Sequence, residues 1–429
     1  MIFLDVRIDD IGDGISFSFE MDEEEQNKDF GRISFGSSVV TVRLDGLDSA
    51  SIHPDLLALS SILMCHPFVG KELNYPNPVS EKFNEAVNGL ISRYEFKPKS
   101  GELVRPRSSG SNFRMGLAFS GGVDSTAALS VLPEDSVPVF MLRPSRGKSL
   151  YDPSAALESC KLLEEVGYDV RVVECDVEFI REPVGFPTDL SHAIPSILLA
   201  DDMCIDSLAF GTVMESAFGI GHEKFRDYWK GSHWKFYSEL LGAVSIDLCL
   251  PVSGVSEVGT AIIVNSTPLG ELSQSCIRGK WKKPCKRCWK CCRKGLLSSA
   301  LELVDLKSED LELMFSSEDV RNKLSSIPIS HENVIEYALQ RIDRDLHPNF
   351  PFLRGRIERG TDLGFLECWF EPSSDFIPEK YRKEICGKIK NLLRTMDERE
   401  EEKVRKWDLL DYYESEETES LAKLVSDNW

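Results

Sequence analysis

The stretch Met115-Gly116-Leu117-Ala118-Phe119-Ser120-Gly121-Gly122-Val123-Asp124-Ser125-Thr126 decides the fold of this chain. Its apolar first half is typical of a buried strand, and a helical pattern follows the Ser-Gly-Gly turn at once. Gly121 and Gly122 have no Cβ, so the backbone can point several N–H groups into one concavity. A helix that begins near Asp124 directs the positive end of its dipole at the same point. The stretch therefore predicts an oxyanion cradle between a strand and a helix.

Composition and charge limit the class of protein. The chain has 429 residues, which suggests two or three domains, and its 50 basic and 71 acidic residues give a net charge of −21. Because attraction to phosphate dominates nucleic-acid affinity, this charge makes a nucleic-acid partner unlikely in our interpretation. No apolar run approaches the length of a membrane span, and the N-terminus lacks the basic region of a signal peptide. We expect a cytoplasmic protein with no membrane partner, whose twelve cysteines are reduced.

The pattern of apolar residues divides the chain into three parts. Residues 1–105 show period-two alternation and predict a β-rich accessory domain, followed by a Pro-, Gly- and Ser-rich linker at 98–111. Residues 112–305 alternate strands with helices, which predicts an α/β domain with a doubly wound parallel sheet. Residues 306–429 predict a mostly helical C-terminal region. Its acidic stretch 411–419 is interpreted as a solvated tail or a partner-facing segment.

The predicted elements of the central part place the motif at one edge of the sheet. The expected strands lie at 115–119, 137–142, 169–174, 207–212 and 248–250, and the expected helices include 153–167 and 190–204. Ligands of open parallel sheets bind at the carboxyl ends of the strands. The Ser120-Gly121-Gly122 turn and the pair Gly211-Thr212 both follow predicted strands, so we expect them at that edge.

A cysteine cluster predicts a second feature, a metal site within residues 276–291. Its members follow a Cys-x8-Cys-x2-Cys-x2-Cys spacing and are Cys276, Cys285, Cys288 and Cys291. Four thiolates complete a closed tetrahedral zinc site, which is normally structural. Cys292 remains an alternative to Cys291 as the fourth ligand. The Lys and Arg residues around the cluster either neutralise the thiolates or form a phosphate- or partner-binding surface, and the sequence leaves both alternatives open.

The two motifs together resemble a known enzyme family. The Ser-Gly-Gly-x-Asp-Ser loop resembles that of the PP-loop (adenine nucleotide alpha-hydrolase) ATP pyrophosphatase superfamily. With the cysteine spacing and the stretch Leu248–Ser256, it resembles 7-cyano-7-deazaguanine synthase over about residues 113–305. The resemblance implies an ATP-dependent C–N ligase that adenylates 7-carboxy-7-deazaguanine, releases AMP and pyrophosphate, and forms an amide or a nitrile. It also implies ATP, Mg²⁺ and Zn²⁺ as cofactors.

The resemblance also implies site residues. The ATP site is assigned to Ser120, Gly121, Gly122, Val123, Asp124, Ser125 and Met141, with Asp124 and Ser125 as the catalytic pair and Asp124 as the candidate for Mg²⁺ or loop geometry. Candidates for substrate binding are Arg146, Lys148, His192, Gly211, Thr212 and Glu215. The aromatic and Gly-rich segment 218–237 is expected to form a lid over the site.

Three elements depart from the family pattern, namely residues 143–148, residues 190–195 and Glu257, where the family has Lys. Handling of substrate and ammonia therefore stays open. The long flanks resemble those of relatives in antiviral defence gene clusters, so one alternative is deazaguanine-type modification of a protein amine. Another is a PP-loop enzyme that modifies tRNA or a nucleobase. The expected partners are a small deazaguanine-type acid and an amine donor, while a modified partner protein and a homodimer remain open.

Overall fold

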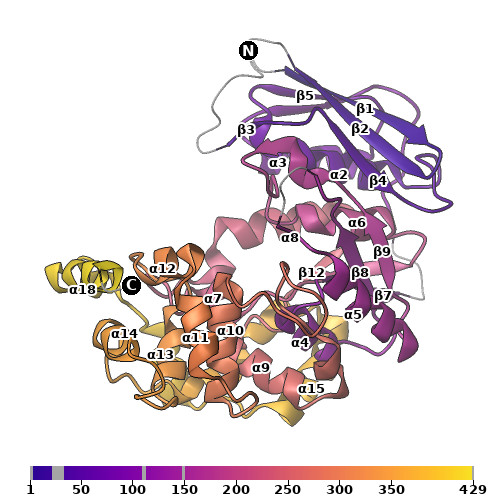
Figure 1. Cartoon of the computed structure of the whole chain (residues 1–429). Helices are drawn as coiled ribbons and strands as arrows, with labels where there is room; N and C mark the ends of the chain where they lie inside the picture. The colour runs from indigo at the N-terminus through magenta and orange to yellow at the C-terminus, as the bar shows by residue number, and fades with distance from the viewer. Residues whose placement is uncertain (1–2, 22–32, 109–112, 147–149, 428–429) are drawn as a thin grey trace.

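The computed structural model describes residues 3–21, 33–108, 113–146 and 150–427 (Figure 1). The N-terminal part contains a mixed sheet with the strand order β4-β2-β1-β5-β6. Its strands are β1 (Phe3–Ile11), β2 (Gly14–Met21), β4 (Val39–Arg43), β5 (Glu72–Tyr75) and β6 (Glu95–Pro98), and its helices are α2 (Pro54–Cys65) and α3 (Glu81–Leu90). The strands expected from period-two alternation are confirmed. The two short strands β5 and β6 were not predicted, because four residues carry too little alternation to be recognised.

The central part contains a parallel sheet of five strands in the order β12-β11-β7-β8-β9. They are β7 (Arg114–Phe119), β8 (Val137–Leu142), β9 (Arg171–Glu174), β11 (Ile205–Ala209) and β12 (Asp247–Cys249). The chain continues from β7 to β8 on one side and later returns to β11 on the other side of β7. Such a reversal leaves a crevice at the carboxyl ends of the strands. The predicted α/β class with a parallel sheet is confirmed.

Helices cover both faces of this sheet. Along β7, Leu117 and Phe119 face a core with α4 (Val123–Val131), α5 (Ser154–Glu165), α9 (Glu257–Asn265) and α15 (Glu379–Leu392). Ala118 points to the opposite face, toward α6 (Ile194–Leu198) and α8 (Ser232–Ala243). This alternation follows from the period of two along a strand, and it explains why the strands are apolar on both sides.

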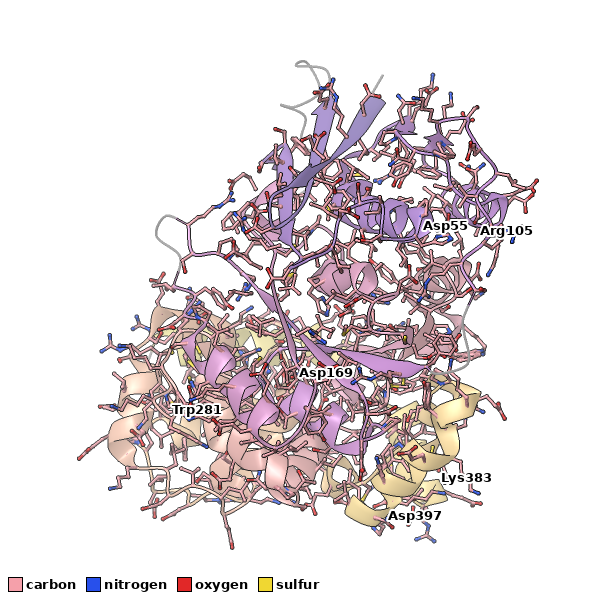
Figure 2. The ribbon with its side chains drawn as sticks, turned by 90° about the vertical axis from the view of Figure 1, so that its right-hand side faces the viewer. Asp55, Arg105, Asp169, Trp281, Lys383 and Asp397 are labelled. Atoms are coloured by element: carbon pink, nitrogen blue, oxygen red, sulfur yellow. The ribbon has the colours of Figure 1, made fainter. Side chains whose placement is uncertain are left out.

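The N-terminal part shares its core with the second face of the central sheet. Helix α2 is buried along its whole length between its own sheet and α6. At the sheet edge, Val42 pairs with Cys175, and the Thr41 N–H donates to Asp176 at 2.7 Å. Figure 2, turned by 90° from Figure 1, shows Asp55 and Arg105 in the N-terminal part, Asp169 beside the central sheet, and Lys383 and Asp397 toward the opposite end.

The predicted linker at 98–111 contains a buried side chain, Arg107. Its guanidinium donates to Asp201 at 2.7 Å and to the Ile205 carbonyl at 2.9 Å. The described part of this linker is therefore anchored to the core.

The helix expected at 190–204 is shorter than predicted. It consists of a 3₁₀ turn η3 (Ser191–Ala193) followed by α6. The Ala200 carbonyl accepts the N–H of Ile205 at 2.7 Å, where the chain turns into β11.

The C-terminal region is helical, as predicted, and it folds back on itself (Figure 1). Its helices are α11 (Ser308–Phe315), α12 (Glu318–Leu324), α13 (Glu332–Leu339), α14 (Phe350–Ile357), α15 (Glu379–Leu392), α16 (Glu398–Arg405), α17 (Leu410–Tyr413) and α18 (Glu416–Asp427). The region is preceded by α10 (Trp289–Ala300), which begins within the cysteine cluster. Within the part of the chain that the structure describes, every helix is too short or too polar to cross a bilayer.

Residues 411–419 do not form a free tail, although their acidic side chains are exposed. The alternative of a partner-facing segment stays a prediction. Tyr413 is buried and its hydroxyl donates to Glu332 at 3.2 Å, while α18 packs against α14. The acidic run supplies the first turn of α18, where the helix dipole favours negative charge. A charged stretch thus forms a packed helix because its apolar residues, such as Ala422, face the neighbouring helices.

Candidate functional site

The predicted cradle is built at the carboxyl end of β7. Gly121 adopts a φ of +73° and Gly122 caps α4, which begins at the next residue. A Cβ on Gly121 would lie 3.2 Å from the Cα of Ala156, so the turn also needs a residue without a side chain. The Ser120 and Ser125 hydroxyl oxygens lie 3.0 Å apart, and the Ser120 N–H donates to Ser125 at 3.2 Å. The loop therefore gathers hydroxyl and N–H groups at the positive end of α4.

The segment just before the cysteines fixes this loop. The Gln274 N–H donates to the Gly121 carbonyl at 2.8 Å, and the Val123 N–H donates to the Ser275 hydroxyl at 3.2 Å. Cys276 follows directly in the chain. The candidate metal site therefore lies next to the candidate phosphate site, and the hydrogen bonds of Gln274 and Ser275 connect the two.

Asp124 is held by two donors. Its Oδ1 accepts from Lys294 Nζ at 2.9 Å and from the Thr260 hydroxyl at 2.9 Å. Lys294 also lies 3.0 Å from Glu257, and its side chain is almost buried. Burial acts to lower the pKa of Lys294, but the charges of Asp124 and Glu257 outweigh it and raise that pKa above its ordinary value. Lys294 is therefore a cation at neutral pH, beside the loop.

Glu257, which departs from the family pattern, is the centre of a buried charge network. Its carboxylate lies 2.8 Å from Arg293, 3.0 Å from Lys294 and 3.0 Å from His331. Burial acts to raise the pKa of Glu257, but Lys294 and Arg293 hold it well below its ordinary value. Glu257 is therefore an anion, and α10 brings the amine of Lys294 against it.

Glu215, a candidate for substrate binding, lies behind this network, where Asn333 Nδ2 donates to it at 2.9 Å and the Glu257 N–H at 3.1 Å. It is fully buried, and burial together with the charge of Glu257 raises its pKa. In this structure Glu215 braces the start of α9 and is separated from the cavity described next.

A cavity of about 990 Å³ opens at the carboxyl ends of β7 and β11. It brings together most of the residues predicted for the site, and those on its wall are Ser120, Asp124, Ser125, Met141, His192, Gly211 and Thr212. Gly211 permits a close approach, because a Cβ there would lie 2.8 Å from the backbone of Asp124. The segment expected to form a lid, 218–237, supplies Arg226 and Tyr228 to the same wall.

The other substrate candidates take different positions. The His192 ring packs against Phe186 and Phe210, with centroids 5.8 and 5.4 Å away, and burial lowers its pKa to about 4. It is therefore neutral at physiological pH. Arg146 pairs with Asp176 and lies 4.6 Å from the ring centroid of Phe179, away from the cavity wall. Lys148 lies outside the described residues.

Three cationic residues line the cavity wall, which are Arg143, Arg226 and Lys290. The sequence interpretation did not assign Arg143 or Arg226 to the site, whereas Lys290 is one of the basic residues for which a phosphate- or partner-binding surface was left open. Arg143 bonds Glu178 at 3.0 Å and stacks on the Tyr151 ring at 3.8 Å. It directly follows β8, so the rule that ligands bind at carboxyl strand ends could have identified it. Arg226 comes from an irregular segment and had no such signal, whereas the signal for Lys290 was the run of basic residues around the cysteines.

The cysteine cluster fits a zinc ion. The four sulfur atoms lie within 4.8 Å of one another, and those of Cys285 and Cys291 are 3.8 Å apart. Thiolates that share one zinc at about 2.3 Å in tetrahedral geometry are about 3.8 Å apart. Cys292 is buried in a separate cluster, with Trp289 and Leu296 of the same helix. The structure therefore favours Cys291 as the fourth ligand.

The basic residues around the cysteines fall into two groups. Lys286 pairs with Asp310 at 2.6 Å, and Arg278 pairs with Asp319 at 3.2 Å, so these side chains hold α11 and α12 against the metal segment. Lys290 instead faces the cavity, together with Cys276 and Ile277. The metal segment is thus one wall of the cavity.

A family model described as "Family of unknown function (DUF6395)" matches residues 236–408, from within α8 to the residues after α16. No curated protein and no solved structure matches the chain. The matched region contains the four clustered cysteines, Glu257 and Lys294, and it begins after the Ser120–Ser125 loop. The description of this family assigns no activity. The similarity covers the part of the candidate site that lies around the cysteine cluster and does not cover the Ser120–Ser125 loop.

Proposed function

We propose that this protein adenylates a 7-deazaguanine-type carboxylic acid with ATP, releases AMP and pyrophosphate, and passes the acyl group to an amine to give an amide or, after a second ATP-dependent step, a nitrile. The observation that carries the proposal is the Ser120–Ser125 cradle, which opens into a large cavity where the strand order reverses. Backbone N–H groups at a helix N-terminus bind phosphate groups well.

The size and lining of the cavity support two ligands side by side. At about 990 Å³ it lies at the upper end of the range for small-molecule sites, about 300–1,000 Å³. Phe186, His192 and Phe210 offer an aromatic surface for a flat ring, and Arg143 and Arg226 offer charge for a carboxylate. A neutral His192 suits an uncharged heterocycle better than an imidazolium would.

The residues of the loop have separate tasks in this proposal. The Ser120 and Ser125 hydroxyls at the N-terminus of α4 hold the departing pyrophosphate, and Asp124 would hold Mg²⁺ beside it. When bound, Mg²⁺ neutralises phosphate charge and orients the phosphates. Lys294 keeps Asp124 in place and adds positive charge next to the loop.

Zinc has a structural task in the same proposal. Cys276 and Ile277 lie on the cavity wall, and the preceding Gln274 and Ser275 bond the loop. A closed four-thiolate site would fix this wall and thereby position the loop.

The test is the reaction itself. The purified protein is incubated with ATP, Mg²⁺ and 7-carboxy-7-deazaguanine, in the presence and absence of ammonia, and AMP, pyrophosphate and acyl products are measured by mass spectrometry. Exchange of labelled pyrophosphate into ATP reports adenylation alone. We expect exchange that depends on the acid.

Two matched variants on α4 sharpen this test. Ser125→Ala removes a hydroxyl of the cradle and is expected to slow exchange about 10²-fold. Ser130→Ala, on the same helix, removes a hydroxyl that bonds the Thr126 carbonyl outside the cavity and should leave exchange unchanged. Absence of acid-dependent exchange, or equal exchange in both variants, would contradict the proposal.

A further inference from the structure

Three side chains form a hydrogen-bonded chain on the cavity wall, apart from the loop. The Tyr228 hydroxyl lies 2.8 Å from His233 Nδ1, and His233 Nε2 lies 2.9 Å from Asp189 Oδ2. All three residues line the cavity. Tyr228 begins the 3₁₀ turn η4 (Tyr228–Lys230), His233 lies in the first turn of α8, and Asp189 precedes η3.

The direction of the hydrogen bonds follows from the chemistry of the groups. A carboxylate only accepts, so the proton of a neutral His233 lies on Nε2 and is donated to Asp189. Nδ1 then carries a lone pair and accepts the Tyr228 O–H. The imidazole is thus oriented by a carboxylate and is ready to receive a proton through the phenol.

The chain of groups runs from the cavity to the solvent. The side chains of Asp189 and His233 are 74% and 41% exposed, whereas burial raises the pKa of Tyr228 to about 12. The hydrogen bond from His233 lowers the pKa of Asp189, which stays ionised. A proton that enters at Tyr228 therefore has a path to water at the other end.

Neighbouring groups hold the side chains of Tyr228, His233 and Asp189 in place. The Asp189 N–H donates to the Tyr237 hydroxyl at 3.3 Å, and the His233 ring stands edge-on to Tyr237 at 4.7 Å. The Tyr228 ring packs edge-on to Phe376 at 5.4 Å. A partly exposed hydrogen bond of this kind contributes about 1 kcal/mol to stability. Removal of this contact should therefore cost the fold little, and variants of the three residues can be tested for function.

We propose that Tyr228, His233 and Asp189 form a proton relay that serves as the general base for the amine that attacks the acyl adenylate. This inference rests on the proposed function and names the second half of the reaction. The substrate class is ammonia or a primary amine.

The amine nitrogen forms a bond to the acyl carbon, and the bond from that carbon to the phosphate oxygen breaks, so AMP leaves with the electron pair. One amine proton passes to the Tyr228 oxygen while the Tyr228 proton passes to His233 Nδ1. The imidazolium is stabilised by the Asp189 carboxylate and then releases its proton to water.

The test separates the two halves of the reaction in the full-length protein. Pyrophosphate exchange measures adenylation. Hydroxamate formation measures the attack of hydroxylamine, a nucleophile strong enough to need no base. Amide formation with ammonia or methylamine measures the step that needs the relay. Tyr228→Phe and His233→Gln should keep exchange and hydroxamate formation, while amide formation falls about 10²-fold or more.

The matched control is Trp229→Phe, which changes the same 3₁₀ turn next to Tyr228. Trp229 is half exposed and stacks on Trp234 at 5.5 Å, outside the relay. It should form amide at the rate of the unmodified protein. The relay is refuted if both relay variants form amide at that rate, or if they lose exchange as well, since they would then serve adenylation. Absence of exchange in the unmodified protein would instead refute the proposed function and the relay together.

Discussion

Lys294 Nζ lies 2.9 Å from Asp124 Oδ1, and this contact joins the helix that follows the cysteine cluster to the helix that begins at the candidate phosphate loop. Lys294 and Asp124 are 170 residues apart in the sequence. Because Lys294 is also 3.0 Å from Glu257, one amine balances two carboxylates in a nearly buried position.

Replacement of Lys294 by Met should destabilise the protein and abolish adenylation. The replacement removes one of the cations beside Glu257, whose side chain is only 1% exposed. The free energy of unfolding should fall by about 3 kcal/mol. Urea denaturation measures it. Lys406→Met is the matched control, because Lys406 pairs with Glu402 on the surface and should cost at most about 0.5 kcal/mol. Equal losses in the two variants would contradict the role of Lys294.

The cysteine cluster should bind one zinc ion per chain, held by Cys291 and not by Cys292. Elemental analysis of Cys291→Ser should find the metal lost or strongly reduced, since a hydroxyl replaces one of four thiolates. Cys292→Ser should retain a full equivalent of zinc, although it places a hydroxyl among Trp289 and Leu296 and lowers stability. Retention of the metal in the first variant and loss in the second would show that Cys292 is the ligand.

A methyl group at Gly121 should weaken ATP binding. The residue has a φ of +73°, and its Cβ would lie 3.2 Å from Ala156, so Gly121→Ala strains the loop by about 1–2 kcal/mol. Calorimetric titration with ATP and Mg²⁺ measures the affinity. Gly387→Ala is the control, because Gly387 lies within α15 with open space around it. It should leave affinity unchanged and stabilise the helix by up to about 1 kcal/mol. Equal affinities would show that the loop does not bind the phosphates.

Stability should fall as the pH is lowered from about 6.5 to about 4, partly because of His192. Burial lowers its pKa from 6.5 to about 4, so in this window the unfolded chain binds a proton that the folded chain does not. The unfolded state therefore gains stability as the pH falls. His192→Phe removes up to about 1.4 kcal/mol per pH unit from the slope of unfolding free energy against pH. Urea denaturation at several pH values measures it, and an unchanged slope would contradict a neutral His192.

The apolar strand, the glycine turn and the helix start were predictable because they depend on neighbours in the sequence. The same is true of the cysteine cluster, whose spacing lies within sixteen residues. The placement of Ser120, Ser125, His192 and Gly211 on one cavity follows from the parallel sheet that the alternating pattern predicts. The enzymatic activity, the cofactors ATP and Mg²⁺ and the partners stay predictions.

Other residues depended on contacts that no local pattern reveals. Glu215 follows a strand end as a ligand-binding residue would, yet its carboxylate turns toward Asn333, which comes from α13. Arg107 sits in a stretch with the composition of a linker, and its burial is decided by carbonyl groups about 100 residues away. The acidic run near the C-terminus forms a packed helix because partner helices cover its apolar side.

The sequence by itself determined the parallel sheet, the loop at the end of β7 and the thiolate cluster, since strand periodicity, glycine conformations and ligand spacing are local properties. Only the tertiary structure decided which charges meet at the loop. Lys294 and Glu257 come from α10 and α9, and their charges interact because burial removes water from between them. His331 reaches Glu257 from the residue before α13. The tertiary structure also brought Asp189 to His233 and Tyr228, and so decided where a proton can leave the cavity.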